Sequence, residues 1–123
     1  MADEIKLTVN GQMINGNFRD YFRPAQITYT MSAATGGNPG TVTVGTSEEN
    51  IVFGDVAPGL VIIHNLDATN FVTFGQDNAS TMQPCGEVGP GRVAVFELAT
   101  SQTLRMAADT AAVNCLIKGY PVS

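Results

Sequence analysis

LVIIHNLDATNFVTFG, the sequence of residues 60–75, consists of two short apolar runs separated by a polar turn. The first run, Leu60–His64, is apolar almost throughout, which is typical of a strand with both faces covered. The second run, Asn70–Phe74, follows the turn-forming residues Asn65-Leu66-Asp67-Ala68. Both runs have the length of strands and are too short for helices. This stretch therefore predicts two neighbouring β-strands.

The same pattern of short predicted strands separated by turn residues extends in both directions along the chain. Thirteen glycines and six prolines disfavour helix interiors, and short segments with alternating polarity predict strands. The further predicted strands are Glu4–Val9, Gln26–Met31, Thr41–Val44, Asn50–Phe53, Arg92–Leu98, Thr103–Ala107 and Val113–Lys118. Turn dipeptides such as Asn15-Gly16 and Pro58-Gly59 separate them. We expect an all-β protein, an antiparallel β-sandwich or jelly-roll-like fold with about eight or nine short strands and little or no helix.

The chain of 123 residues is expected to form a single β-sandwich domain, residues 1–123. Within it, residues 1–31 are predicted to be an N-terminal arm or edge strands. Residues 32–40, rich in small residues and glycine, are expected to be a flexible loop. Residues 41–123 are expected to be the main β-domain.

Charge and hydropathy exclude several classes of function. Charged residues make up only 14% of the chain, against about 25% in an average domain, which suggests a surface partly covered by other chains. The net charge is −5 and the six basic residues are scattered, so no nucleic-acid partner is expected. The sequence has no apolar run of the length that a membrane helix needs. The first residues, Met-Ala-Asp-Glu, lack a signal-peptide pattern, so synthesis in a cytoplasm and reduced cysteines are expected.

Residues that could carry chemistry do not form a recognisable set. His64 could act as a base oriented by Asp67, but no Gly-x-Ser-x-Gly motif supplies a nucleophile. Cys85, in the predicted loop Gln83–Gly86, and the apolar-flanked Cys115 lack the paired spacing of zinc ligands. We therefore expect no enzyme activity, no cofactor and no metal.

The carboxylates also lack a catalytic or calcium-binding pattern. Glu48 and Glu49 are adjacent, and on a strand they would point to opposite faces. A calcium site at Asp67 and Asp77 is conceivable, but the EF-hand pattern is absent. Solvated loops are the simpler interpretation of these residues.

An aromatic and basic segment stands out near the N-terminus. Aromatic and arginine side chains together are favoured at protein interfaces. The alternative is that Phe18 and Phe22 pack into the core of the domain. The candidate interface consists of Phe18, Arg19, Tyr21, Phe22 and Arg23.

Several segments resemble small β-sandwich virion proteins of tailed phages, of the capsid decoration or cement type. Residues 60–75 are similar to a pair of strands in which the first ends in Asn-Leu-Asp and the second in Gly. Gly89–Leu98 resembles the following Pro-Gly turn and strand, and Leu104–Val113 is similar to the closing segment. Ile5–Val9 with Asn17-Phe18 also fits the pattern.

This resemblance implies a non-enzymatic structural protein of the virion, assembled in the host cytoplasm. The first expectation is a capsid decoration protein that binds and stabilises the outer shell. Its partners would be the major capsid protein or other virion proteins, and it would form a homo-oligomer, with a trimer as the guess. The alternatives are a neck, tail or head-fibre component and, from another class, a carbohydrate-binding module, which the absence of Trp weakens.

Overall fold

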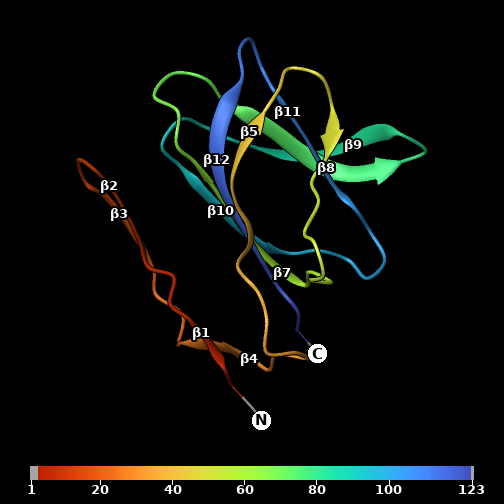
Figure 1. Cartoon of the computed structure of the whole chain (residues 1–123). Helices are drawn as coiled ribbons and strands as arrows, with labels where there is room; N and C mark the ends of the chain where they lie inside the picture. The colour runs from red at the N-terminus through yellow and green to blue at the C-terminus, as the bar shows by residue number, and fades with distance from the viewer. Residues whose placement is uncertain (1–2, 123) are drawn as a thin grey trace. The chain divides into compact units, whose positions relative to one another are not determined.

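The computed structural model of the protein describes residues 3–122, which form two compact units. One unit comprises residues 3–33 together with Val122, and the other comprises residues 34–121. The described chain is all-β, with twelve strands and no helix. Figure 1 shows the course of the chain through the strands. The all-β, sandwich-type fold class predicted from the sequence is confirmed.

The smaller unit contains two short antiparallel pairs. Strand β1 (Ile5–Leu7) pairs with β4 (Ile27–Tyr29), and β2 (Gly11–Asn15) pairs with β3 (Phe18–Phe22). A single bridge between Met31 and Val122 joins the start and the end of the chain within this unit. The unit therefore consists of the β2–β3 hairpin, the β1–β4 pair that flanks it in the sequence, and one bridge between distant residues.

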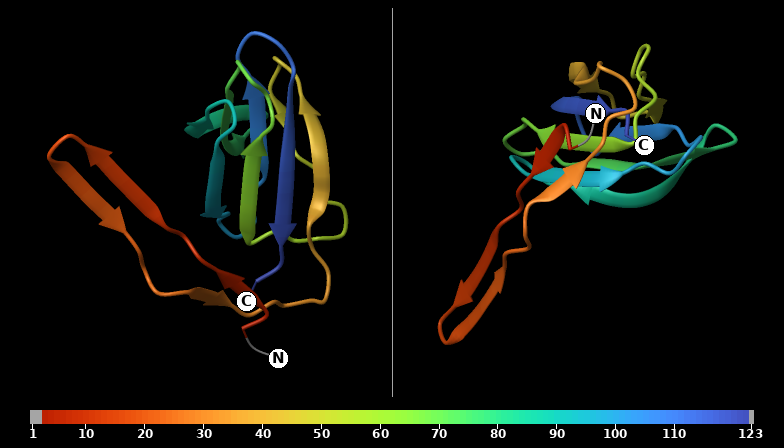
Figure 2. Two further views of the ribbon diagram at one scale, coloured as in Figure 1. Left: turned by 90° about the vertical axis from the view of Figure 1, so that its left-hand side faces the viewer. Right: turned by 90° about the horizontal axis from the view of Figure 1, so that it is seen from below.

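The larger unit contains eight strands in two four-stranded sheets. One sheet has the order β10-β7-β12-β5 and the other β6-β11-β8-β9, and every pair is antiparallel. The left view of Figure 2 shows the first sheet face on. The strands are β5 (Asn38–Val44), β6 (Glu49–Asn50), β7 (Leu60–Asn65), β8 (Val72–Asn78), β9 (Thr81–Val88), β10 (Val93–Glu97), β11 (Leu104–Ala108) and β12 (Val113–Tyr120).

The connections between these strands define the topology. Each one passes from one sheet to the other except the β8–β9 hairpin, whose two strands are neighbours. Eight antiparallel strands with this order, in two sheets, form a jelly roll. The larger unit is therefore a jelly-roll β-sandwich.

The inward faces of both sheets supply the core. On β7, Val61 and Ile63 point inward and are fully buried, while Ile62 and His64 on the other face are half-buried. The same alternation along β11 and β12 buries every second residue. The core residues are Val44, Ile51, Phe53, Val56, Val61, Ile63, Val72, Val88, Leu104, Met106, Ala108, Val113, Cys115 and Ile117.

Three local predictions need correction. Strand β5 begins at Asn38, so residues 38–40 are part of a sheet and not of a flexible loop over 32–40. The segment Gln83–Gly86, predicted as a loop, lies inside β9. Strands β2, β3 and β9 raise the number from eight or nine to twelve. Strands β2 and β3 flank the recognised Asn15-Gly16 turn, and β9 is an edge strand interrupted by Pro84 and a bulge.

Candidate interaction surface

The β2–β3 hairpin is formed by a two-residue turn. Asn15 and Phe18 are the last paired residues, and Gly16 and Asn17 lie between them. Gly16 has φ of 60°, whereas Asn17 is not in the positive-φ region. Glycine at the first central position is the signature of a type II′ turn, whose twist matches that of the two strands. The sequence Asn-Gly-Asn-Phe thus fixes the register of the hairpin.

That register divides the side chains of the hairpin between two faces. Residues opposite one another share a face, and neighbours along a strand alternate. Because Asn15 faces Phe18, Met13 faces Asp20 and Gly11 faces Phe22, one face carries Met13, Phe18 and Phe22 together with the polar Asn15 and Asp20. Phe18 is 60% exposed and Phe22 is 55% exposed. We call this the apolar face of the hairpin.

The opposite face is mixed in character. Gln12 faces Tyr21 and Ile14 faces Arg19, and Arg23 follows at the end of β3. The guanidinium of Arg23 lies 4.4 Å from the centre of the Tyr21 ring, a cation–π contact that contributes about 0.5–1 kcal/mol at an exposed site. We call this the arginine face of the hairpin.

Of the five residues predicted as an interface, four lie on β3 and Arg23 directly follows it, and they divide between two faces. Phe18 and Phe22 belong to the apolar face, whereas Arg19, Tyr21 and Arg23 belong to the arginine face. The alternative in which both phenylalanines pack into the core does not occur in this chain, since both side chains are exposed.

Sequence reasoning missed two members of this surface, Met13 and Ile14 on β2. Both are more than 40% exposed. The signal was present: Gly-Gln-Met-Ile-Asn runs into the Asn15-Gly16 turn, and a strand on each side of such a turn is the usual hairpin pattern.

Apolar side chains on both faces of a two-stranded hairpin are energetically unusual. An isolated hairpin is marginally stable at best in water, and large exposed apolar patches mark interaction sites. Methionine, aromatic residues and arginine are the types enriched in interfaces. The hairpin therefore has the composition and exposure of a surface that a partner covers.

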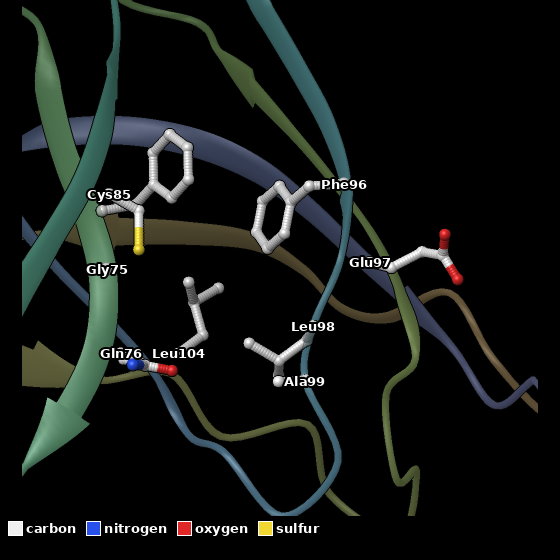
Figure 3. Close-up of a pocket in the computed structure, with 9 residues that line it drawn as sticks. Gly75, Gln76, Cys85, Phe96, Glu97, Leu98, Ala99 and Leu104 are labelled. Atoms are coloured by element: carbon white, nitrogen blue, oxygen red, sulfur yellow. The ribbon is translucent and has the colours of Figure 1, made fainter.

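The jelly roll contains a second apolar feature, an open pocket of about 270 Å³. Figure 3 shows Cys85 and the Phe96 ring on opposite sides of it, with the Glu97 carboxylate turned away. Phe74 stacks on Phe96 at 5.0 Å between ring centres. The lining residues are Phe74, Gly75, Gln76, Cys85, Phe96, Glu97, Leu98, Ala99 and Leu104.

A β-bulge places Cys85 at this pocket. Phe74 pairs with Gly86 and Gly75 pairs with Pro84, so Cys85 is an extra residue in β9. A bulge re-aims the side chain of its extra residue and is commonest at sheet edges. Pro84 fits because β9 is an edge strand of its sheet.

The loop between β7 and β8 is held by two polar side chains. Asn65 is fully buried, and its amide donates to the carbonyl oxygens of Asn70 and Val88, each at 2.9 Å. The Asp67 carboxylate accepts from the N–H groups of Asn70 at 2.7 Å and Thr69 at 3.0 Å. These hydrogen bonds hold the pKa of Asp67 below its usual value. Asp67 is thus engaged by its own loop rather than by His64, which lies on the outer face of β7.

The two cysteines occupy different environments. Cys85 is exposed, whereas Cys115 is buried on β12 in the other sheet. Burial, with a smaller effect from the charge of Asp67, raises the pKa of Cys115 to about 11. Within residues 3–122, no three histidine, cysteine or carboxylate side chains are grouped as a metal site would require.

The acidic residues considered as pairs have separate partners. The Glu48 carboxylate accepts from the Met82 N–H at 2.9 Å and from Arg105 Nε at 3.1 Å, which lowers its pKa. The Glu49 carboxylate accepts from a different N–H, that of Gly45, at 3.1 Å. Glu48 and Glu49 therefore do not form a shared acid–base site.

Asp67 and Asp77 lie at opposite ends of β8. Asp67 precedes the strand, whereas Asp77 is near its end, roughly 17 Å from Val72 at the usual rise per residue. Asp77 instead lies 3.7 Å from the Arg105 guanidinium. The structure therefore does not bring this conceivable calcium pair together.

Within the described part of the chain, no helix is long and apolar enough to span a membrane. Comparisons with protein-family models, with curated proteins and with solved structures found no match.

Proposed function

We propose that this chain is a non-enzymatic structural protein of a tailed-phage virion, a capsid decoration protein that binds the outer shell and stabilises it. The observation that carries the proposal is the β2–β3 hairpin, which exposes Met13, Phe18, Tyr21 and Phe22 to solvent. A monomer gains little from such exposure, whereas a component of an assembly gains an anchoring surface.

Two further features support an assembly role. Charged residues are scarce, at 14% of the chain, and interface cores are depleted of charge. The jelly roll is a fold used in viral capsid proteins, although it also occurs in lectins and other proteins, so the fold alone does not decide the function. The sequence resemblance described above favours the virion among these possibilities.

The proposed mechanism is multivalent binding. Each copy contributes a contact of modest strength through its hairpin, and copies at symmetric positions are linked by the shell. Because the contacts act together, the shell is held by their combined strength. The partners are the major capsid protein or other virion proteins.

A binding experiment with purified protein and capsid shells lacking it tests the proposal. The wild-type chain is expected to bind and to raise the temperature at which shells rupture. A variant with alanine at Phe18, Arg19, Tyr21, Phe22 and Arg23 is expected to bind at least about a hundredfold more weakly, since interface anchors contribute about 2 kcal/mol or more each.

A matched control replaces two exposed apolar residues of the jelly roll, Val52→Ala with Leu66→Ala. This variant should bind shells like the wild type. Failure of the wild type to bind shells, or full binding by the five-residue variant, would contradict the proposal. The number of copies per particle separates shell from neck or tail, because a shell protein is present at every equivalent site.

A further inference from the structure

The pocket of the jelly roll lies between two edge strands. Strand β9 pairs only with β8, and β10 pairs only with β7, within residues 3–122. Phe74, Cys85 and Leu104 come from one sheet, and Phe96 from the other. The pocket is thus an opening between the two sheets at an edge of the sandwich.

The size and lining of the pocket fit an aromatic side chain. A cavity of roughly 150 Å³ lined by apolar residues accepts benzene, and this pocket measures about 270 Å³. The stacked rings of Phe74 and Phe96 offer aromatic edges and faces to a further ring, and Cys85 lies across the pocket from the Phe96 ring.

The apolar face of the hairpin supplies such rings. Phe18 and Phe22 are four residues apart on one strand, so they point the same way and are separated by roughly 13 Å. Every copy of the chain therefore carries an exposed aromatic strand and an apolar pocket. A head-to-tail contact of this kind covers both at once and closes into a ring if the rotation between copies allows it.

The net charges of the hairpin and the jelly roll are opposite. The hairpin carries +1, because Arg19 and Arg23 on its arginine face outweigh Asp20 on its apolar face, whereas the jelly roll carries the whole net charge of −5. Opposite net charges favour the approach of one copy's hairpin to another copy's jelly roll. The charged residues of the jelly roll are Glu48, Glu49, Asp55, Asp67, Asp77, Glu87, Glu97, Asp109, Arg92, Arg105 and Lys118.

We infer that a phenylalanine of the apolar face, Phe18 or Phe22, inserts into the pocket beside Cys85 of a second copy of the chain. The inference rests on the proposed role of the hairpin as a contact arm and assigns its two faces. The apolar face joins copies to one another, and the arginine face is left for the shell.

Cys85 provides a direct test by disulfide trapping. Phe18→Cys and Phe22→Cys are made singly, so that the other ring remains, and each purified protein is treated with diamide. At least one variant should give dimers and larger species on a gel without reductant. Adding Cys85→Ser should abolish them, and the buried Cys115 should not contribute.

Ile14→Cys, on the arginine face, is the matched control. It should give at least tenfold less cross-linked product than the better phenylalanine variant. Equal products from both faces, or no product above wild type from either phenylalanine position, would overturn the inference.

Sedimentation velocity supplies a second measurement without introduced thiols. The wild type should self-associate, Phe18→Ala with Phe22→Ala should do so at least tenfold more weakly, and Ile14→Ala with Tyr21→Ala should behave like the wild type. A wild type that stays monomeric at every concentration overturns the inference. If the chain self-associates but does not bind shells, the decoration role is wrong and this contact stands. If it binds shells but does not self-associate, this contact is wrong and the decoration role stands.

Discussion

The jelly roll and the hairpin unit treat apolar side chains in opposite ways. Every buried hydrophobic residue among residues 3–122 belongs to the jelly roll. Of the large hydrophobic residues that are exposed, seven lie in residues 3–33, namely Val9, Met13, Ile14, Phe18, Tyr21, Phe22 and Ile27. One unit is thus stabilised by its own core, while the apolar surface of the other is available to a partner.

The sharpest test of this contrast makes the same substitution, isoleucine to alanine, at one position in each unit. Ile63→Ala should lower the free energy of unfolding by about 2–5 kcal/mol, because Ile63 is fully buried and its loss leaves a cavity. Ile14→Ala should change it by less than about 0.5 kcal/mol, because the side chain is exposed. Denaturant unfolding followed by circular dichroism measures both. Similar losses would show that the hairpin has a core of its own.

A second test concerns how tightly the jelly roll is packed at the bulge. A Cβ on Gly75 would overlap the Gln83 carbonyl group, with its carbon at 2.8 Å. Gly75→Ala should therefore destabilise the fold by about 3 kcal/mol. Gly45→Ala is the control, since nothing lies within 4 Å of its Cβ position, and it should leave stability within about 0.5 kcal/mol. If the unfolding midpoint of Gly75→Ala equals that of the wild type, β9 can move away from the added methyl group.

A third test compares the turns of the two hairpins. The β2–β3 turn uses Gly16 at positive φ, whereas the β8–β9 turn places Ala79 and Ser80 at φ of 53° and 68°. Left-handed backbone is strained for such residues. Replacing them with Asn-Gly, the preferred type I′ pair, should stabilise the jelly roll by about 1 kcal/mol. A rise in the thermal midpoint checks this, and a fall would contradict it.

The smallest expected effect is an acid-dependent one in the jelly roll. The pKa of Asp67 is lowered by hydrogen bonds from Asn70 and Thr69, so its carboxylate stabilises the fold above pH 3.8, its ordinary pKa. This contribution is lost as the pH falls through the lowered value. Asp67→Asn should reduce the loss of thermal stability between about pH 5 and pH 2. If the melting temperatures of the wild type and Asp67→Asn fall equally over this pH range, Asp67 does not contribute.

Burial decided which strands of the jelly roll could be predicted from the sequence. Strands such as Leu60–His64 are shaped by burial, and burial selects the apolar runs that a pattern detects. Strand β9, with Pro84 and a bulge at Cys85, has no such period, because an edge strand can leave the ladder locally. Its assignment needed the pairing with β8.

The candidate surface was predicted in composition but not in arrangement. The segment Phe18–Arg23 was identified from its residue types alone. Its division into two faces required the register, in which Met13 joins Phe18 and Phe22. The pocket around Phe74 and Phe96 was not predicted, because its lining residues come from separate strands that only the jelly-roll order brings together.

The bridge between Met31 and Val122 sets an order of events during synthesis. Residues 34–121 are continuous and can fold as soon as they leave the ribosome, in keeping with the way that domains fold as units. The smaller unit is interrupted by that whole segment, so its bridge forms only after Val122 has been made. The β2–β3 hairpin pairs within residues 11–22 alone and can form early, so the bridge to Val122 is the last contact of the smaller unit to close.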